Sequence, residues 1–189
     1  MPYTAFDRFV AWRRFCAAIP HVRAGARICD IGCGLEAAFL SYARPRINFG
    51  VGLDYRVSPR ESTGAAIVRA DIARGLPLRS ASFDHAVMLA VLEHLRAPVD
   101  VLQEAFRILI PGGSLIVTWP NPIVDSILTV TKGIGLTSPE MESDKHEQRV
   151  PLPSLLAMLK AIGFHDFLHR RFEFGLNNLL VARKPLSKR

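Results

Sequence analysis

The segment RICDIGCGLEAAFL, residues 27–40, joins a buried strand to a helix through a glycine-rich turn. Glycine inside a regular element costs stability, about 1 kcal/mol in a helix, so Gly32 and Gly34 need a physical reason. Ligands of open α/β sheets bind at the carboxyl ends of strands, where glycine lets them approach the backbone. Backbone N–H groups at such a turn also favour an anion or a polar ligand group. The segment therefore predicts a ligand site, with a bare β–α turn as the alternative.

Strands and helices alternate along most of the chain. Apolar runs predict strands over residues 26–32, 47–54, 65–71, 82–90 and 113–120. Helical spacing predicts helices over residues 36–43, 98–109 and 153–163. Two final extended segments, 164–174 and 177–184, are joined so closely that they must be antiparallel. We therefore expect a doubly wound α/β fold, with a mostly parallel seven-stranded sheet, an antiparallel C-terminal edge and helices on both faces.

The length of 189 residues fits one domain. Within residues 1–189 we expect an N-terminal helical segment over 1–24 and a cofactor-binding core over 25–120. A substrate flap over 121–152 and a C-terminal helix with a strand pair over 153–184 follow. The flap is inferred because a long segment with little periodicity in a compact domain is usually disordered or functional.

The first predicted helix covers residues 5–19. Helical spacing places one set of its side chains near a single face, which we expect to pack inward, and leaves Arg8 and Arg14 elsewhere. That set is Phe6, Phe9, Val10, Arg13 and Ala17. The helix also carries Trp12, which could fold across the mouth of the site.

Charge and cysteine content restrict the function classes. The formal charge of +7 could attract nucleic acid, anionic lipid or an acidic substrate, but the basic residues form separate short groups, which favours a solvated surface. The three cysteines, Cys16, Cys29 and Cys33, have no C-x-x-C pairing, so we expect buried thiols and no metal site. The N-terminus lacks a signal-peptide pattern and no run of 18 apolar residues occurs, so we expect a cytoplasmic location.

Carboxylates stand at the ends of three predicted strands: Asp30, Asp54 and Asp71. Packing would not favour such a set, because charged residues are seldom buried. Asp54 lies about 20 residues beyond the glycine turn, where an acceptor-only side chain can grip a ribose diol. The sequence thus predicts a nucleotide-like cofactor at this edge.

The motifs ICDIGCG, VGLDYR, VRADI, AVLEHL and EAFRILIPGGSLIVTWPNP occur in the order and spacing of one family. They resemble the class I S-adenosylmethionine-dependent methyltransferases, in particular the small type 11-like enzymes that act on metabolites, lipids or glycans. The resemblance covers about residues 25–122 and implies a Rossmann-like methyltransferase fold with S-adenosylmethionine as cofactor. One departure is Glu36, which stands where glycine is common; it either narrows the entrance or acts on the helix dipole.

By resemblance, the glycine turn lies along the methionine part of the cofactor, Asp54 takes both ribose hydroxyls, Tyr55 lies against the adenine and Asp71 accepts from the adenine amino group. Asp71 could equally be a helix N-cap. The complete cofactor set implied is Asp30, Gly32, Cys33, Gly34, Asp54, Tyr55, Asp71, Ile72, Leu89 and Ala90.

Two histidines are candidate bases for the reaction. His94 follows the fourth strand and His146 lies on the expected flap, and an imidazole titrates near neutrality. A packing role for His94 and a solvated role for His146 are the alternatives, and methyl transfer needs no base when the acceptor is already nucleophilic. Trp119, at the end of the fifth strand, could line a substrate pocket or the core.

Three other functions compete. A G-x-G-x-x-G dinucleotide site tolerates Ala37 at its third glycine position, so NAD is the alternative cofactor. A binding module without transfer activity is the second alternative. The third is RNA methylation, although residues 89–92 read LAVL where base amino-methyltransferases often carry an Asn/Asp-Pro-Pro-aromatic motif. The expected acceptor is a small molecule or is linked to a lipid or glycan; peripheral membrane contact and the oligomeric state are left open.

Overall fold

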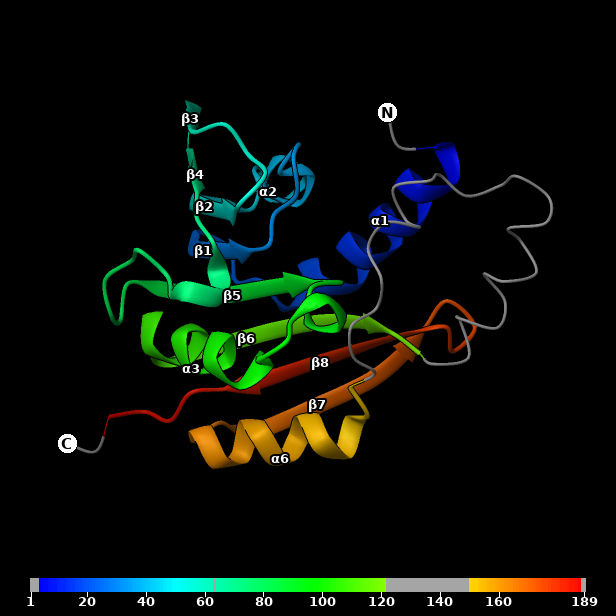
Figure 1. Ribbon diagram of the computed structural model, residues 1–189, viewed down its shortest axis with the longest axis vertical. Coiled ribbons are helices and arrows are strands. Elements are labelled where there is room, and N and C mark those ends of the chain that lie inside the picture. The colour runs from blue at the N-terminus through cyan, green and yellow to red at the C-terminus, as the bar shows by residue number, and fades with distance from the viewer. Residues whose placement is uncertain (1–3, 63, 122–149, 188–189) are drawn as a thin grey trace.

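The computed structural model describes residues 4–62, 64–121 and 150–187. Within them the chain forms one eight-stranded sheet in the order β3-β4-β2-β1-β5-β6-β8-β7 (Figure 1). The strands are β1 Ala26–Ile31, β2 Ile47–Asp54, β3 Arg60–Ser62, β4 Ala65–Arg69, β5 Phe83–Leu89, β6 Leu109–Pro120, β7 His165–Phe172 and β8 Asn177–Arg183.

Strand directions confirm the predicted topology. The neighbours β4, β2, β1, β5 and β6 are parallel, whereas β8 runs antiparallel to both β6 and β7. The seven predicted strands are all present. The eighth, β3, is a three-residue antiparallel edge strand beside β4, which the sequence does not signal because it is short and polar.

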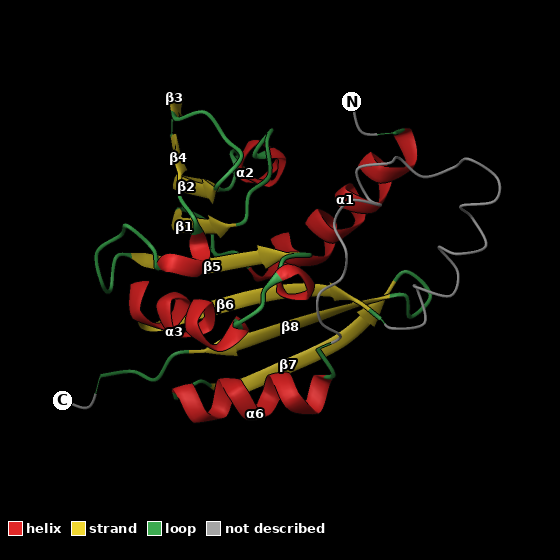
Figure 2. Ribbon diagram, in the orientation of Figure 1, coloured by secondary structure: helices red, strands yellow, loops and turns green. Residues whose placement is uncertain are grey.

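Helices cover both faces of the sheet, as predicted (Figure 2). The helices α3 (Pro98–Ile108) and α6 (Leu152–Ile162) pack on one face, and α1 (Ala5–Ala18) and α2 (Ala38–Ala43) on the other. Short 3-10 turns add η1 Ile19–His21, η2 Ile72–Arg74 and η3 Leu92–His94. Central strands buried on both faces explain the near-continuous apolar runs of the sequence.

Helix α2 is shorter than predicted. It begins at Ala38 because Ala37 adopts a left-handed conformation, with φ 47°. Glu36 therefore lies in the exposed turn before the helix, and no side chain caps this N-terminus. The end predicted for the helix over residues 153–163 is confirmed, since Gly163 terminates α6 with φ 113°.

The predicted inward face of α1 is buried only in part. Its buried residues are Asp7, Ala17 and Ala18, whereas Phe6 and Phe9 are exposed. Contacts with other elements set the orientation, since Arg170 Nη2 donates to the Ala17 carbonyl at 3.4 Å and Arg14 lies near Glu93 and Glu173. Asp7 completes a capping box in which Thr4 Oγ1 accepts from the Asp7 amide at 3.1 Å and Asp7 Oδ2 accepts from the Thr4 amide at 2.9 Å.

The prediction of three buried thiols was only partly right. Cys29 is fully buried in the core, but Cys16 and Cys33 are half-buried. Burial raises the pKa of the Cys33 thiol to about 12, so this thiol stays protonated and poorly nucleophilic at neutral pH. The side chain of Cys33 packs where Gly52 of β2 leaves room, since a Cβ on Gly52 would lie 2.8 Å from Cys33 Sγ.

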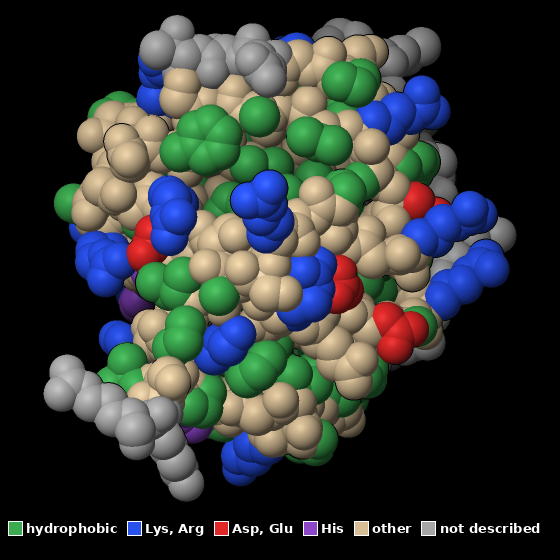
Figure 3. Space-filling model, turned by 90° about the vertical axis from the view of Figure 1, so that its left-hand side faces the viewer, with side chains coloured by type: hydrophobic (Ala, Val, Ile, Leu, Met, Phe, Trp, Pro, Cys, Tyr) green, Lys and Arg blue, Asp and Glu red, His purple; other side chains and the backbone are tan. Residues whose placement is uncertain are grey.

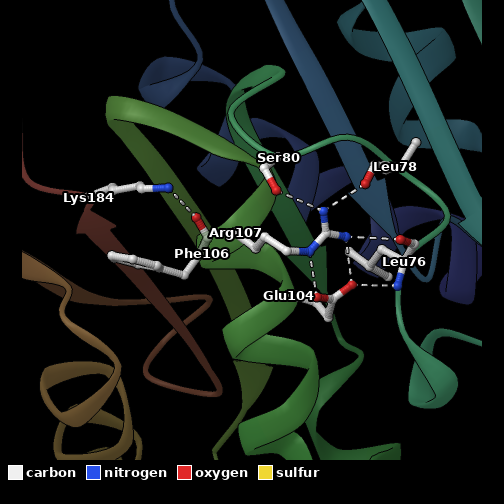
Figure 4. A network of polar contacts seen from close by, with 7 residues as sticks. All are labelled: Leu76, Leu78, Ser80, Glu104, Phe106, Arg107 and Lys184. Carbon is white, nitrogen blue, oxygen red and sulfur yellow. Dashed lines mark hydrogen bonds and ion pairs between the residues drawn. The ribbon is translucent and has the colours of Figure 1, made fainter. Parts of the chain in front are cut away.

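Arg107 of α3 fastens the loop between η2 and β5 (Figure 4). Its guanidinium donates to the carbonyls of Leu76 and Leu78 at 3.0 and 2.7 Å, and it pairs with Glu104 on the same helix. Glu104 in turn accepts from the Leu76 amide at 2.7 Å. The hydrogen bond from Arg107 lowers the pKa of Glu104, which keeps the pair ionised.

We expect Arg107→Ala to lower the free energy of unfolding by about 1–3 kcal/mol, because two loop carbonyls lose a charged donor. For a chain of this size that corresponds to a fall in Tm of about 2–10 °C, measured by thermal denaturation. Arg79→Ala, at an exposed position in the same loop, is the control and should leave Tm nearly unchanged. Equal Tm values for the two variants would contradict the role given to Arg107.

Basic side chains lie in separate groups on the face shown in Figure 3, which agrees with the dispersed charge of the sequence. In the part of the chain that the structure describes, no helix is both long and apolar enough to cross a bilayer.

Candidate functional site

The carboxyl ends of β1, β2, β4 and β5 meet at one edge of the sheet because these strands are parallel. Asp30 lies in β1, opposite Gly52 of β2, and Asp54 ends β2. The glycine turn, residues 32–34, follows β1 directly. The structure therefore brings the predicted turn and two of the predicted carboxylates together.

Gly32 is required by its surroundings. Its φ is +76°, and a Cβ built on it would lie 2.6 Å from Val91 Cγ2. Its amide donates to the Leu53 carbonyl at 2.7 Å, and the Cys33 amide donates to the same oxygen at 3.0 Å. The turn is thus fixed against the end of β2 by the chain's own hydrogen bonds.

Gly34 has a different environment. Its φ is +69°, but a Cβ on it would meet nothing within 4 Å. Its amide donates to Asp54 Oδ2 at 3.0 Å. All three amides of the turn are therefore used within the protein, and the expectation that they offer donors to a ligand is corrected: the glycines provide space.

Asp54 is buried yet keeps capacity for a ligand. Oδ2 accepts from Gly34 and Oδ1 accepts from the Arg56 amide at 2.9 Å, with Arg56 Nε 3.5 Å away. A carboxylate offers about four acceptor positions, so about two remain for hydroxyl donors. This geometry fits the predicted grip on a ribose diol.

Asp30 is only 2% exposed, and its Oδ2 has no hydrogen-bond partner. Burial, together with the nearby charge of Asp54, raises the pKa of Asp30 to about 7. An unpartnered buried carboxyl is costly unless a cation or donor completes it. Asp30 therefore fits a cationic ligand group at this edge.

Stability should depend on pH through Asp30. In the unfolded chain this carboxyl ionises near pH 4, but in the folded protein it ionises near pH 7, so folding loses stability as pH rises from about 4 to about 7. We expect Asp30→Asn to be free of this loss and therefore to gain stability relative to wild type between pH 5 and pH 8, measured by urea denaturation. Asp71→Asn, at an exposed carboxylate, is the control. A difference between Asp30→Asn and wild type that does not change with pH would contradict the assignment.

The adenine-side residues lie at the next strand end. Tyr55 is 58% exposed, with the Arg56 guanidinium 5.5 Å from its ring centroid. Asp71 is the N-cap of η2, where Oδ1 accepts from the Ala73 amide at 3.2 Å, so the capping interpretation is present in the structure. The other oxygen, Oδ2, lies 3.1 Å from Arg74 Nε in an exposed ion pair, so a ligand at this position would compete with Arg74. Ile72 packs partly against the core.

The end of β5 carries Leu89 and Ala90. Leu89 packs against the core cluster beneath α1, and Ala90 has a left-handed φ of 57° with its amide bonded to the Thr118 carbonyl. His94 ends η3 and is half-buried. Trp119 is a core residue, 4% exposed and 6.1 Å from the His169 ring, so its packing interpretation is the one observed. His146 and most of the expected flap fall outside the described residues.

A buried charge cluster beside this edge was not predicted. Burial lowers the pKa of Arg14 on α1, and the carboxylates of Glu93 and Glu173 act in the opposite direction. Glu173, in the turn after β7, accepts from Asn177 Nδ2. The sequence indicates this cluster only weakly, because helical spacing separates Arg14 from the apolar set of α1 without showing which side of the helix packs inward.

The comparisons with known proteins agree with this geometry. Residues 29–117 match the model of a methyltransferase domain. Over these residues the chain is similar to S-adenosylmethionine-dependent methyltransferases. The match begins in β1 and ends in β6, so it contains all ten residues of the expected cofactor set and His94.

Two relatives and one solved structure illustrate the similarity. A Mycolicibacterium smegmatis protein named "Probable S-adenosylmethionine-dependent methyltransferase" is 35% identical over 57% of this chain, and the match spans only 43% of that protein. The demethylmenaquinone methyltransferase of Paenarthrobacter aurescens is 26% identical over 92% of this chain and 76% of its own. A Mesorhizobium loti S-adenosylmethionine-dependent methyltransferase structure has a TM-score of 0.68 at 22% identity, covering 92% and 97% of the two chains. The structural likeness shows that the methyltransferase fold is shared.

Proposed function

We propose that the protein transfers a methyl group from S-adenosylmethionine to a small-molecule, lipid-linked or glycan acceptor. The observation that carries the proposal is the joint environment of Asp30, Gly34 and Asp54. An unpartnered buried carboxyl, open space over a glycine and a partly used carboxylate lie together at the carboxyl edge of the sheet.

Each part of this environment suits one part of S-adenosylmethionine. The spare acceptor positions of Asp54 suit the ribose hydroxyls, and the space at Gly34 suits the methionine chain. The unpartnered oxygen of Asp30 suits the methionine ammonium group. Tyr55 provides an exposed ring for the adenine, and Asp71 Oδ2 could accept from the adenine amino group in exchange for its exposed ion pair with Arg74.

The chemistry requires little from the protein beyond placement. When bound, S-adenosylmethionine supplies a methyl group on a positively charged sulfur. An acceptor lone pair held in line with that methyl group would form the new bond to carbon as the carbon–sulfur bond breaks with its electron pair on sulfur, and the acceptor would then release its proton. In-line positioning away from water supplies much of the rate. His94 is the candidate proton acceptor within the described residues, and loss of the acidic limb of the pH–rate profile in His94→Asn would reveal that role.

Titration calorimetry with S-adenosylmethionine, S-adenosylhomocysteine and NAD tests the proposal. We expect saturable binding of the first two and none of NAD. A folded protein that binds NAD instead, or none of the three, would overturn it. Formation of S-adenosylhomocysteine over a panel of acceptors then separates an enzyme from a binding module, because a module binds the cofactor without product.

A further inference from the structure

Helix α1 exposes its aromatic side chains to water. Phe6, Phe9 and Trp12 are 45%, 53% and 44% exposed, and we call these three residues the aromatic face. Residues three apart lie next to each other on a helix, and the Phe9 and Trp12 ring centroids are 5.9 Å apart. A helix that packs on a sheet normally buries such side chains. The aromatic face is therefore a candidate binding surface.

The exposure is fixed by the opposite side of the helix. On that side Arg14 lies near the carboxylates of the buried Glu93 and the half-buried Glu173, and the Ala17 carbonyl accepts from Arg170 Nη2 at 3.4 Å. Turning the aromatic face inward would move Arg14 away from these carboxylates and expose Ala17 and Ala18, which are buried. The orientation is thus a property of the fold.

The charges around the aromatic face have one sign. Arg8 is exposed beside it, and Arg13 lies 6.0 Å from the Trp12 ring centroid with 41% of its side chain exposed. Asp7 is the one acidic residue in the sequence of α1, and it is buried. Arg13 is only loosely paired, 3.8 Å from Glu173. The outer surface of α1 therefore presents aromatic rings flanked by cations and no exposed anion.

We propose that α1 docks the protein on a bilayer that contains anionic lipids, with Phe9 and Trp12 in the headgroup region and Arg8 and Arg13 near the lipid phosphates. Aromatic and cationic side chains on the outer surface of one helix are typical of interfacial helices. The apolar centre favours lipid over nucleic acid, whose binding would rely mainly on phosphate contacts. Charge complementarity favours an anionic surface over a second copy of this cationic chain.

Docking would place the edge of the sheet that holds the candidate site close to the membrane. Figure 1 shows the outer turns of α1 projecting past the sheet on the side toward which β5 points, which is the edge that holds Asp30 and Asp54. If the proposed methyl transfer is correct, its acceptor would reach that edge from the lipid surface. The docking itself does not depend on methyl transfer.

Vesicle flotation tests the proposal with the full chain. Wild type should float with vesicles of phosphatidylcholine containing about one third phosphatidylserine and remain unbound with phosphatidylcholine alone. Phe9→Ala combined with Trp12→Ala should lower the partition coefficient at least about tenfold, and Arg8→Gln about fivefold. Raising the salt concentration should weaken binding by wild type more than binding by Arg8→Gln.

Leu168→Ala is the matched control, because Leu168 is also an exposed apolar residue, 46% exposed, on the edge strand β7. It should bind vesicles like wild type, and circular dichroism should show that all variants are folded. Absence of wild-type binding to anionic vesicles would overturn the proposal, as would equal losses in Leu168→Ala and the aromatic variant. Dimerisation or RNA binding that is lost in the aromatic variant, without vesicle binding by wild type, would assign the surface to that partner instead.

Discussion

Asp54→Asn should weaken binding of S-adenosylmethionine about 100-fold. The carboxylate accepts two backbone amides and keeps about two acceptor positions, whereas an asparagine has one carbonyl oxygen and must turn an NH₂ group toward Gly34, Arg56 or the ligand. Hydrogen bonds to charged groups contribute about 1.5–3 kcal/mol each, so losing one or two accounts for the expected change. Titration calorimetry measures it directly.

Two controls make this result interpretable. Asp71→Asn changes an exposed carboxylate at the neighbouring strand end, and we expect at most about a tenfold loss because water competes for that site. The Tm of each variant separates loss of binding from loss of fold. A folded Asp54→Asn protein with wild-type affinity would contradict the ribose role of Asp54 and, with it, the proposed placement of the cofactor.

Gly32→Ala should destabilise the protein by about 3 kcal/mol or more, because it combines a left-handed φ with a Cβ 2.6 Å from Val91 Cγ2. The corresponding fall in Tm is about 6–12 °C. Gly34→Ala should cost only about 1 kcal/mol, since its Cβ meets no atom within 4 Å, but should weaken cofactor binding more than about tenfold by filling the space the ligand needs.

Gly25 offers a matched control for both variants. It has a similar φ of +71° and equally open space, but it precedes β1 and so lies at the opposite end of that strand from the site. Gly25→Ala should therefore lose about as much stability as Gly34→Ala while binding the cofactor normally. If Gly34→Ala and Gly25→Ala bound equally well, the glycine turn would be a structural β–α turn with no ligand role.

Local sequence patterns were enough to predict most of the fold. The strand predicted over residues 47–54 is β2 to the residue, and the parallel direction of the central strands was predicted from the alternation of strands and helices. The glycine turn and the carboxylate after β2 were also predictable, because strand ends are marked by where apolar runs stop. Short-range periodicity and turn chemistry determine these features, so they can be predicted from the sequence alone.

The tertiary structure decided which partners each side chain finds. Helical spacing could not show that α1 turns Phe9 outward, because the choice depends on Arg14 meeting Glu173 from the far end of the chain. Nor could it show that the turn amides are already bonded to Leu53 and Asp54, or that Asp30 is buried without a partner. Burial, pKa and hydrogen bonding depend on segments distant in sequence, and only the assembled sheet brings those segments together.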